Sequence, residues 1–227
     1  MFRVPLKIIR PQKKHLSTLI FLHGYQGAAT SIFKSAKKLS SNLEHLRIVL
    51  PTAPFQDATP GFATGRVRSW FYSEKFPFGK SKDIDQMSKK LSSLIFKEQQ
   101  ILLDNGSNEK NLVFGGFSQG GFITIYTALT NLQKQIAGTF GIGSIVPTQE
   151  QLEGKLTLPL KMNSMSHLSI MTKDDPIINY AWNEPSIKYL KSVGVPFENK
   201  LLNKGGHKIT SEAIEILTQW MKKLFTK

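Results

Sequence analysis

Short apolar runs alternate with stretches of helical periodicity along most of the chain, and this alternation restricts the possible folds more than any other feature. The runs are as long as strands and rich in Ile, Val and Leu, which is typical of strands buried on both faces of a sheet. Strands connected through helices are parallel, and the helices then cover both faces of the sheet. Predicted strands span residues 19–22, 47–50, 111–115, 137–142, 168–171 and 197–202, and residues 4–9 add an edge strand.

Start and stop signals place the helices between these strands. Asp83 and Ser211 are candidate N-caps, because a short polar side chain can accept a hydrogen bond from a free N–H group of the first turn. Asn105-Gly106 ends the helix that begins after Asp83. Predicted helices span residues 84–105, 120–132 and 211–225, with weaker patterns at 31–43 and 185–193.

Two long segments follow neither pattern. Residues 51–81 combine prolines and glycines with a cluster of aromatic side chains, and residues 143–167 are rich in Pro, Gly and Met. The first segment is too long for a plain connection, and long ordered loops in compact domains are often functional.

The length of 227 residues and a hydrophobic fraction of 40% suffice for one well-buried core. We therefore expect residues 1–227 to form a single domain. The absence of cysteine excludes a disulfide framework, a thiolate nucleophile and a Cys-ligated metal. Charged residues interrupt the apolar runs near the N-terminus, and no apolar run is long enough to span a bilayer. These features lead us to expect a cytoplasmic protein.

The formal net charge of +14 attracts anionic surfaces, and salt screens this attraction. Two interpretations remain open: the charge serves solubility, or it draws the protein toward anionic membranes or acidic substrates. Nucleic acid is not an expected partner, because the lysines are scattered and form no basic stripe interleaved with aromatic residues.

The segment Gly116-Phe117-Ser118-Gln119-Gly120 has the form G-x-S-x-G, in which a serine occupies a sharp turn between a strand and a helix. The motif alone is weak evidence, but here it follows a predicted strand and precedes a predicted helix. The strained turn requires small neighbours, which Gly116 and Gly120 provide. The helix dipole and free N–H groups at this position favour a developing oxyanion. Ser118 is therefore a candidate nucleophile.

A serine hydroxyl needs a base to act as a nucleophile near neutral pH. In chains with this motif the order is Ser, then acid, then His. Of the five histidines, only His207 both lies downstream of Ser118 and follows a predicted strand. The acid is expected after the strand at 168–171, where Asp174 and Asp175 are both candidates for holding the imidazole in the correct tautomer. Spacing alone does not choose between them.

Acyl transfer also needs two N–H donors for the oxyanion that develops on the carbonyl. The N–H of Gln119, directly after the serine, supplies one. The loop after an early strand supplies the other, and Tyr25 in His23-Gly24-Tyr25 is the candidate.

Several motifs follow one another in a characteristic order: Phe21-Leu22-His23-Gly24, Leu50-Pro51-Thr52-Ala53-Pro54, Ser69-Trp70-Phe71, Phe114-Gly115-Gly116-Phe117-Ser118-Gln119-Gly120-Gly121, Asp175-Pro176 and Gly206-His207. Together they resemble the phospholipase/carboxylesterase family, which includes the acyl-protein thioesterases. The resemblance extends from about residue 16 to about residue 220, and the stretch around Ser118 is highly specific for this family.

The resemblance implies a compact α/β-hydrolase fold with a mostly parallel central sheet, helices on both faces and no large cap domain. It implies that the substrate is an acyl ester or thioester, of the lysophospholipid or S-acylated-protein type, hydrolysed through an acyl-enzyme without a metal or organic cofactor. In this family the acid of the triad stands directly before a proline, which points to Asp175. The donor after His-Gly corresponds to Tyr25.

Three departures from the family pattern lie near the expected substrate cleft. Tyr25-Gln26-Gly27 replaces Leu-Gly-Asp, Tyr72 replaces an acidic residue, and Met171-Thr172 replaces a His-Gly pair before the acid. The departures retain the triad but leave acyl-chain length and the acceptor open. A small-molecule carboxylesterase of the same mechanism therefore remains an alternative, as does a non-catalytic binding protein on a hydrolase scaffold.

Apolar side chains line most small-molecule sites, which makes the aromatic loop a candidate acyl channel. Ordinary core packing is the alternative for the same side chains. The candidate substrate-binding residues are Trp70 and Phe71, followed by Phe76, Met162 and Met165.

Overall fold

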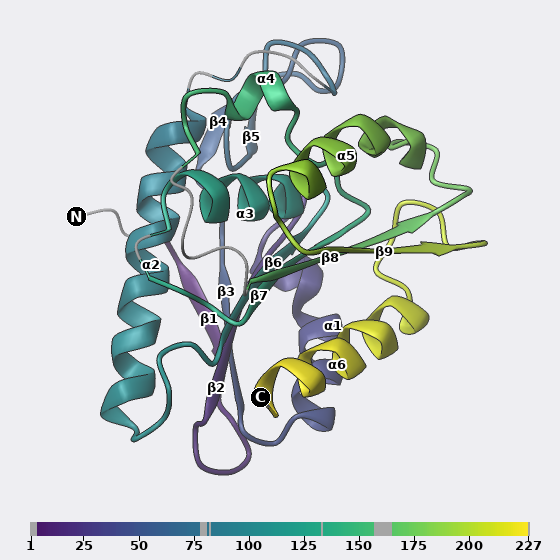
Figure 1. Ribbon diagram of the computed structural model, residues 1–227. Coiled ribbons are helices and arrows are strands. Elements are labelled where there is room, and N and C mark those ends of the chain that lie inside the picture. Colours follow the sequence, from purple (N-terminus) through teal and green to yellow (C-terminus); the bar gives the residue numbers. More distant parts are fainter. Residues whose placement is uncertain (1–3, 78–80, 82, 133, 157–164, 227) are drawn as a thin grey trace.

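Seven strands form one sheet in the computed structural model, which describes residues 4–77, 81, 83–132, 134–156 and 165–226 (Figure 1). Neighbouring strands are parallel except for β1, which pairs antiparallel with β3 at one edge. Every predicted strand is confirmed. In spatial order they are β1 (Leu6–Ile9), β3 (Leu46–Pro51), β2 (Ser17–Leu22), β6 (Leu112–Phe117), β7 (Gly138–Ile142), β8 (Ser166–Thr172) and β9 (Phe197–Leu202).

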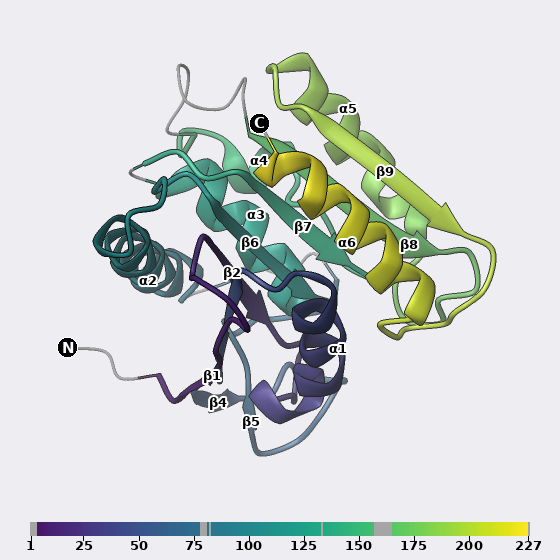
Figure 2. The same cartoon turned by 90° about the horizontal axis from the view of Figure 1, so that it is seen from below.

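Helices cover both faces of this sheet, as Figures 1 and 2 show from two directions, and all five predicted helices are confirmed. No helix in the described ranges is both long and apolar enough to cross a membrane. One face carries α1 (Ala29–Asn42) and α6 (Ser211–Phe225), and the other carries α2 (Ile84–Asp104), α3 (Gln119–Thr130) and α5 (Glu184–Ser192). The short α4 (Gln149–Leu152) and the 3-10 helix η1 (Tyr180–Asn183) lie in connections.

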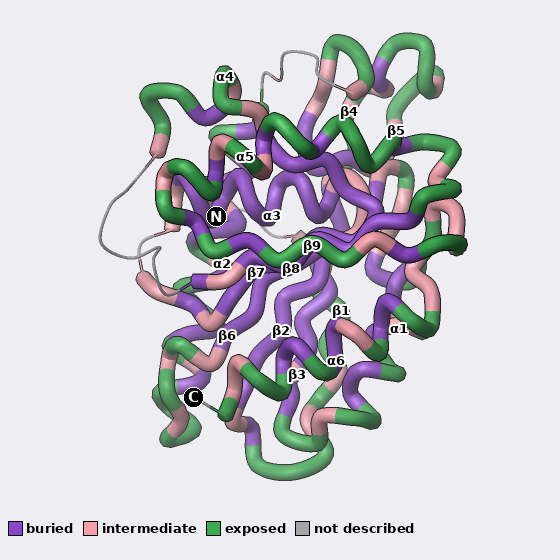
Figure 3. The backbone as a smooth tube through the Cα atoms, turned by 45° about the vertical axis from the view of Figure 1, so that its right-hand side comes forward, coloured by how far each residue is buried: buried purple, intermediate pink, exposed green. Residues whose placement is uncertain are grey.

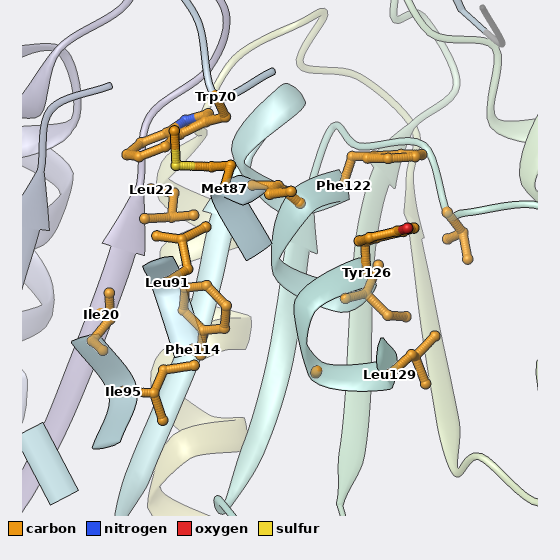
Figure 4. Packing of buried hydrophobic residues seen from close by; sticks show 14 of the residues in the cluster. Ile20, Leu22, Trp70, Met87, Leu91, Ile95, Phe114, Phe122, Tyr126 and Leu129 are labelled. Carbon is orange, nitrogen blue, oxygen red and sulfur yellow. The ribbon is translucent and has the colours of Figure 1, made fainter. Parts of the chain in front are cut away.

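The central strands are buried on both faces because their side chains alternate between two cores. In β2, Leu19 and Phe21 point into the core beneath α1 and α6, whereas Ile20 and Leu22 point into the core beneath α2 and α3. All four side chains are fully buried, and burying one of this size stabilises the fold by roughly 1.5–3 kcal/mol. Figure 3 shows the buried central strands, and Figure 4 shows the core between the sheet, α2 and α3.

Two predicted helix caps differ from the structure. Thr210 caps α6, because its hydroxyl accepts the N–H of Ala213 at 3.0 Å, while the predicted cap Ser211 lies inside the first turn. Asp83 occupies the N-cap position of α2, but its side chain makes no capping hydrogen bond. Its backbone, with φ −111° and ψ 3°, is not extended, and an extended cap residue is the one whose side chain reaches the first-turn N–H groups.

The segment 51–81 contains a short hairpin that the sequence did not reveal. β4 (Phe55–Asp57) and β5 (Arg66–Arg68) pair antiparallel, apart from the main sheet. Strands of three residues are too short to display an alternating pattern, so periodicity could not distinguish them from a loop.

Candidate active site

Ser118 occupies a sharp turn between β6 and α3. Its backbone, with φ 53° and ψ −122°, lies where residues other than glycine are strained, and its N–H donates to Ile142 O at 2.9 Å. A Cβ atom at Gly116 would lie 2.2 Å from the backbone of Gly120, and one at Gly120 would lie 2.5 Å from His23 O. The motif therefore needs both glycines, because backbone segments pass each other at contact distance.

Three side chains that are far apart in the sequence form one hydrogen-bonded chain. Ser118 Oγ lies 3.0 Å from His207 Nε2, and His207 Nδ1 lies 2.8 Å from Asp175 Oδ2. The three residues follow β6, β9 and β8 respectively. Parallel strands end at the same edge of a sheet, which is where ligand sites form in open α/β folds. The structure thus brings together the three residues selected from the sequence.

Asp175 is the aspartate that faces the imidazole. Its side chain is only 1% exposed, and its Oδ1 accepts the N–H groups of Ile177 at 2.8 Å and Ile178 at 2.9 Å. Because an ionised carboxylate only accepts hydrogen bonds, Nδ1 of His207 carries the proton and Nε2 is left to accept one from the serine hydroxyl. The neighbouring Asp174 bonds to the loop before His207 instead.

The backbone N–H groups of Tyr25 and Gln119 have no hydrogen-bond partner among the described residues, and both residues border the cavity at Ser118. Gln119 opens α3, and a helix leaves the N–H groups of its first turn unpaired. The next N–H in the early loop, that of Gln26, donates to Arg68 O at 2.9 Å. Two unpaired donors therefore belong to residues that border the cavity at Ser118, and these are the residues predicted as oxyanion donors.

His23 fixes the loop that carries Tyr25. Its Nε2 accepts the N–H of Ala53 at 2.9 Å, so Nδ1 carries the proton and donates to Gly24 O at 2.7 Å. Burial lowers the pKa of His23 to about 4, which keeps the ring neutral near pH 7 and preserves this pattern. Trp70 supports the same loop by donating its indole N–H to His23 O at 2.7 Å.

The structure separates the residues predicted to bind substrate. Phe71 and Phe76 line the cavity beside Ser118, whereas Trp70 is fully buried and lies outside the cavity lining. Met165 is also part of the core and outside the lining, and Met162 lies outside the described residues. Adjacent aromatic residues of one loop therefore have different places: Trp70 lies in the core and Phe71 lines the cavity.

The side chain of Gln119 makes contacts that the sequence analysis missed. Its amide oxygen accepts the N–H of Trp70 at 3.0 Å, and its amide nitrogen donates to Ser69 Oγ at 2.8 Å and to Phe71 O at 3.0 Å. These bonds tie the start of α3 to the segment that carries the cavity wall. The stretch Ser69-Trp70-Phe71 carried a signal for them, because a serine directly before two buried aromatic residues needs a buried polar partner.

A cavity of about 260 Å³ opens beside Ser118. Phe62 and Phe76 lie at its more exposed side, with ring centroids 5.0 Å apart. No group of three or more His, Asp or Glu side chains that could hold a metal ion occurs among the described residues. The apolar side chains that line the cavity belong to Phe62, Phe71, Phe76, Pro77, Ile84, Phe117, Phe122, Ile145, Ile177 and Ile178.

Comparison with known proteins gives a consistent result. A family model described as phospholipase/carboxylesterase matches residues 5–225. Acyl-protein thioesterase 1 homolog 1 of Dictyostelium discoideum is 25% identical over 219 residues, covering 94% of this chain and 92% of that protein. Lysophospholipase-like protein 1 of Mus musculus is 28% identical over 232 residues, covering 96% and 91%. The crystal structure of Zea mays acyl-protein thioesterase 2 shares the fold, with a TM-score of 0.81 at 18% identity over 98% of this chain and 100% of that chain.

Proposed function

This chain belongs to the phospholipase/carboxylesterase family and is a serine hydrolase of esters or thioesters, and from that premise we propose that Ser118 is its nucleophile, His207 its general base and Asp175 the carboxylate that orients the base. The observation that carries the proposal is the unbroken hydrogen-bonded chain from Ser118 Oγ through both ring nitrogens of His207 to Asp175.

In the first step, Nε2 of His207 takes the hydroxyl proton of Ser118 while Oγ forms a bond to the acyl carbonyl carbon. The carbonyl electrons move onto oxygen, and Asp175 stabilises the imidazolium. When the tetrahedral intermediate collapses, the bond to the leaving alcohol or thiol breaks, and the leaving group takes the proton from Nε2. An acyl-enzyme on Ser118 remains.

In the second step, Nε2 of His207 takes a proton from water as the water attacks the acyl carbon. Collapse of this second intermediate breaks the bond to Oγ, releases the carboxylic acid and returns the proton to Ser118. The N–H groups of Tyr25 and Gln119 hold the oxyanion in both steps. One such donor contributes roughly 3–4 kcal/mol to lowering the barrier.

The acyl chain occupies the apolar cavity beside Ser118. A methylene group takes about the room of a water molecule, whose share of liquid volume is about 30 Å³. A cavity of about 260 Å³ therefore holds a chain of about eight carbons. A longer chain, as in a lysophospholipid or an S-acylated protein, extends past Phe62 and Phe76 at the exposed side.

A series of p-nitrophenyl esters from C2 to C16 tests this placement. Each buried methylene contributes about 0.8 kcal/mol, or at most about fourfold in kcat/KM. We expect kcat/KM to rise from C2 to about C8 and then to level off. Equal rates across the whole series would show that the cavity does not bind the acyl chain.

A panel of esters and thioesters, with a fluorophosphonate probe, tests the catalytic assignment. Wild type should hydrolyse members of the panel and be labelled at Ser118, while Ser118→Ala should lose both properties and keep its fold by circular dichroism. Ser93→Ala, at an exposed position on α2, should behave as wild type. Activity confined to short soluble esters would favour a small-molecule carboxylesterase. A folded wild type that is neither active nor labelled would favour a non-catalytic binding protein.

A further inference from the structure

The turn that carries His207 has little rigidity of its own. Two glycines precede the histidine, and glycine has the greatest backbone freedom of any residue. Gly205 and Gly206 have φ values of 153° and 59°. Lys208 N–H donates to Gly206 O at 3.0 Å, which places His207 at the centre of a three-residue turn. Its ring must nevertheless stay within hydrogen-bond distance of Ser118.

Two side chains at the end of β8 restrain this turn. Thr172 Oγ1 donates to Gly206 O at 2.9 Å. Asp174 accepts the Gly205 N–H at 3.2 Å and the Gly206 N–H at 2.8 Å, one on each carboxylate oxygen. Successive N–H groups of this kind form an anion-binding concavity. Both polar backbone groups of Gly206 and the N–H of Gly205 are therefore held by one strand end.

We propose that Thr172 and Asp174 are positioning residues that clamp the Gly205-Gly206 turn and thereby aim the imidazole of His207 at Ser118. The proposal rests on the catalytic role proposed for His207. The clamp is anchored in the sheet, because β8 is paired with β7 on one side and with β9 on the other, and Thr172 is the last residue of the strand.

Contacts and charge at the clamp support this role. A Cβ atom at Gly205 would lie 2.9 Å from Thr172 Cγ2, so the threonine packs directly on the turn. Position 172 departs from the His-Gly pair that the family resemblance leads one to expect, and a glycine there could not donate a hydrogen bond to Gly206. The N–H groups of Gly206 and Gly205 also lower the pKa of Asp174, which keeps its carboxylate ionised. Asp174 thus binds the backbone before His207, whereas the adjacent Asp175 binds the His207 ring.

Steady-state kinetics on p-nitrophenyl butyrate tests the clamp. Thr172→Val keeps the side-chain volume but removes the hydroxyl, and Asp174→Ala removes both acceptors. Misplacement of a catalytic group by about 1 Å can cost about a hundredfold in rate, so we expect kcat to fall about ten- to a hundredfold, with KM changed less than about threefold. Thr172→Ser, which restores the hydroxyl, should recover most of kcat, and Asp174→Asn, which keeps one acceptor, should lie between wild type and Asp174→Ala.

Matched controls separate positioning from general stability. Thr218→Val on α6 also removes one hydroxyl that donates to a backbone carbonyl, and Asp104→Ala removes a carboxylate at the end of α2; neither should lower kcat. The clamp is refuted if an active wild type, labelled at Ser118, loses no more kcat on Thr172→Val and Asp174→Ala than on these controls, or if Thr172→Ser fails to recover it. Absence of Ser118 labelling in wild type would instead refute the proposed function on which the clamp rests.

Discussion

Replacement of Asp175 by asparagine should inactivate the enzyme while leaving its structure intact. Oδ1 of Asp175 accepts two backbone N–H groups, whereas Oδ2 faces His207 Nδ1. In Asp175→Asn the amide oxygen must take the Oδ1 position, because an NH₂ group there would face two donors. The amide nitrogen then donates to Nδ1, which forces the ring proton onto Nε2, and Nε2 can no longer accept the proton of Ser118. The same substitution in another serine hydrolase lowers kcat about 10⁴-fold, which corresponds to about 5 kcal/mol of barrier.

Comparing the stability of Asp175→Asn with that of Asp175→Ala tests how the two carboxylate oxygens are used. Asp175→Asn keeps an acceptor for the N–H groups of Ile177 and Ile178, while Asp175→Ala leaves both without one. The Ile177 bond is exposed and the Ile178 bond is partly buried, so the loss is about 1–3 kcal/mol, mostly from Ile178. We therefore expect urea denaturation to give Asp175→Asn a higher free energy of unfolding than Asp175→Ala, although both variants are nearly inactive. Asp104→Asn serves as the control for an aspartate outside the site. Retention of more than about a tenth of wild-type kcat in Asp175→Asn would refute the orientation argument.

Three further predictions address the loop around the serine and the surface charge. The pKa of His23 falls from 6.5 to about 4 on folding, so the unfolded chain binds the additional proton between these values and stability is lost as pH falls from about 6.5 toward 4. The free energy of unfolding lost in this way is about 2 kcal/mol at pH 5. Between pH 7 and pH 5, the urea midpoint should therefore fall less for His23→Gln than for wild type. Gly120→Ala should abolish activity or folding, since its Cβ would lie 2.5 Å from His23 O. Gly61→Ala, with open space around it, should cost only about 1–2 kcal/mol of backbone strain. Equal Tm values for the two variants would contradict the steric argument. Because of the net charge of +14, added salt should reduce hydrolysis on anionic vesicles more than hydrolysis of a neutral soluble ester, and an equal response would show that the charge has no bearing on catalysis.

The pattern around Ser118 was highly predictive because it is local. A strand, a serine between two glycines and a helix lie within one short stretch, and steric contacts inside that stretch decide the turn. Chain order, together with a position after a predicted strand, then singled out His207. By contrast, the cap of α6 could not be located to the residue, because Thr210 and Ser211 are adjacent and both can cap, while at the correctly located cap of α2 the backbone of Asp83 prevents the expected side-chain hydrogen bond.

The amino-acid sequence by itself determined the order of the main-sheet strands and of the five long helices, the elbow at Ser118 and the loop that carries His207, because apolar periodicity and glycine placement act over a few residues. Spacing left Asp174 and Asp175 open, and only the family resemblance favoured Asp175. The tertiary structure decided what each neighbour contacts: Asp175 faces the ring while Asp174 binds the turn, and Phe71 lines the cavity while Trp70 supports the loop at His23. The physical reason is that the direction of a side chain at the end of a strand depends on what the neighbouring strands and loops place opposite it, and those partners come from distant parts of the chain.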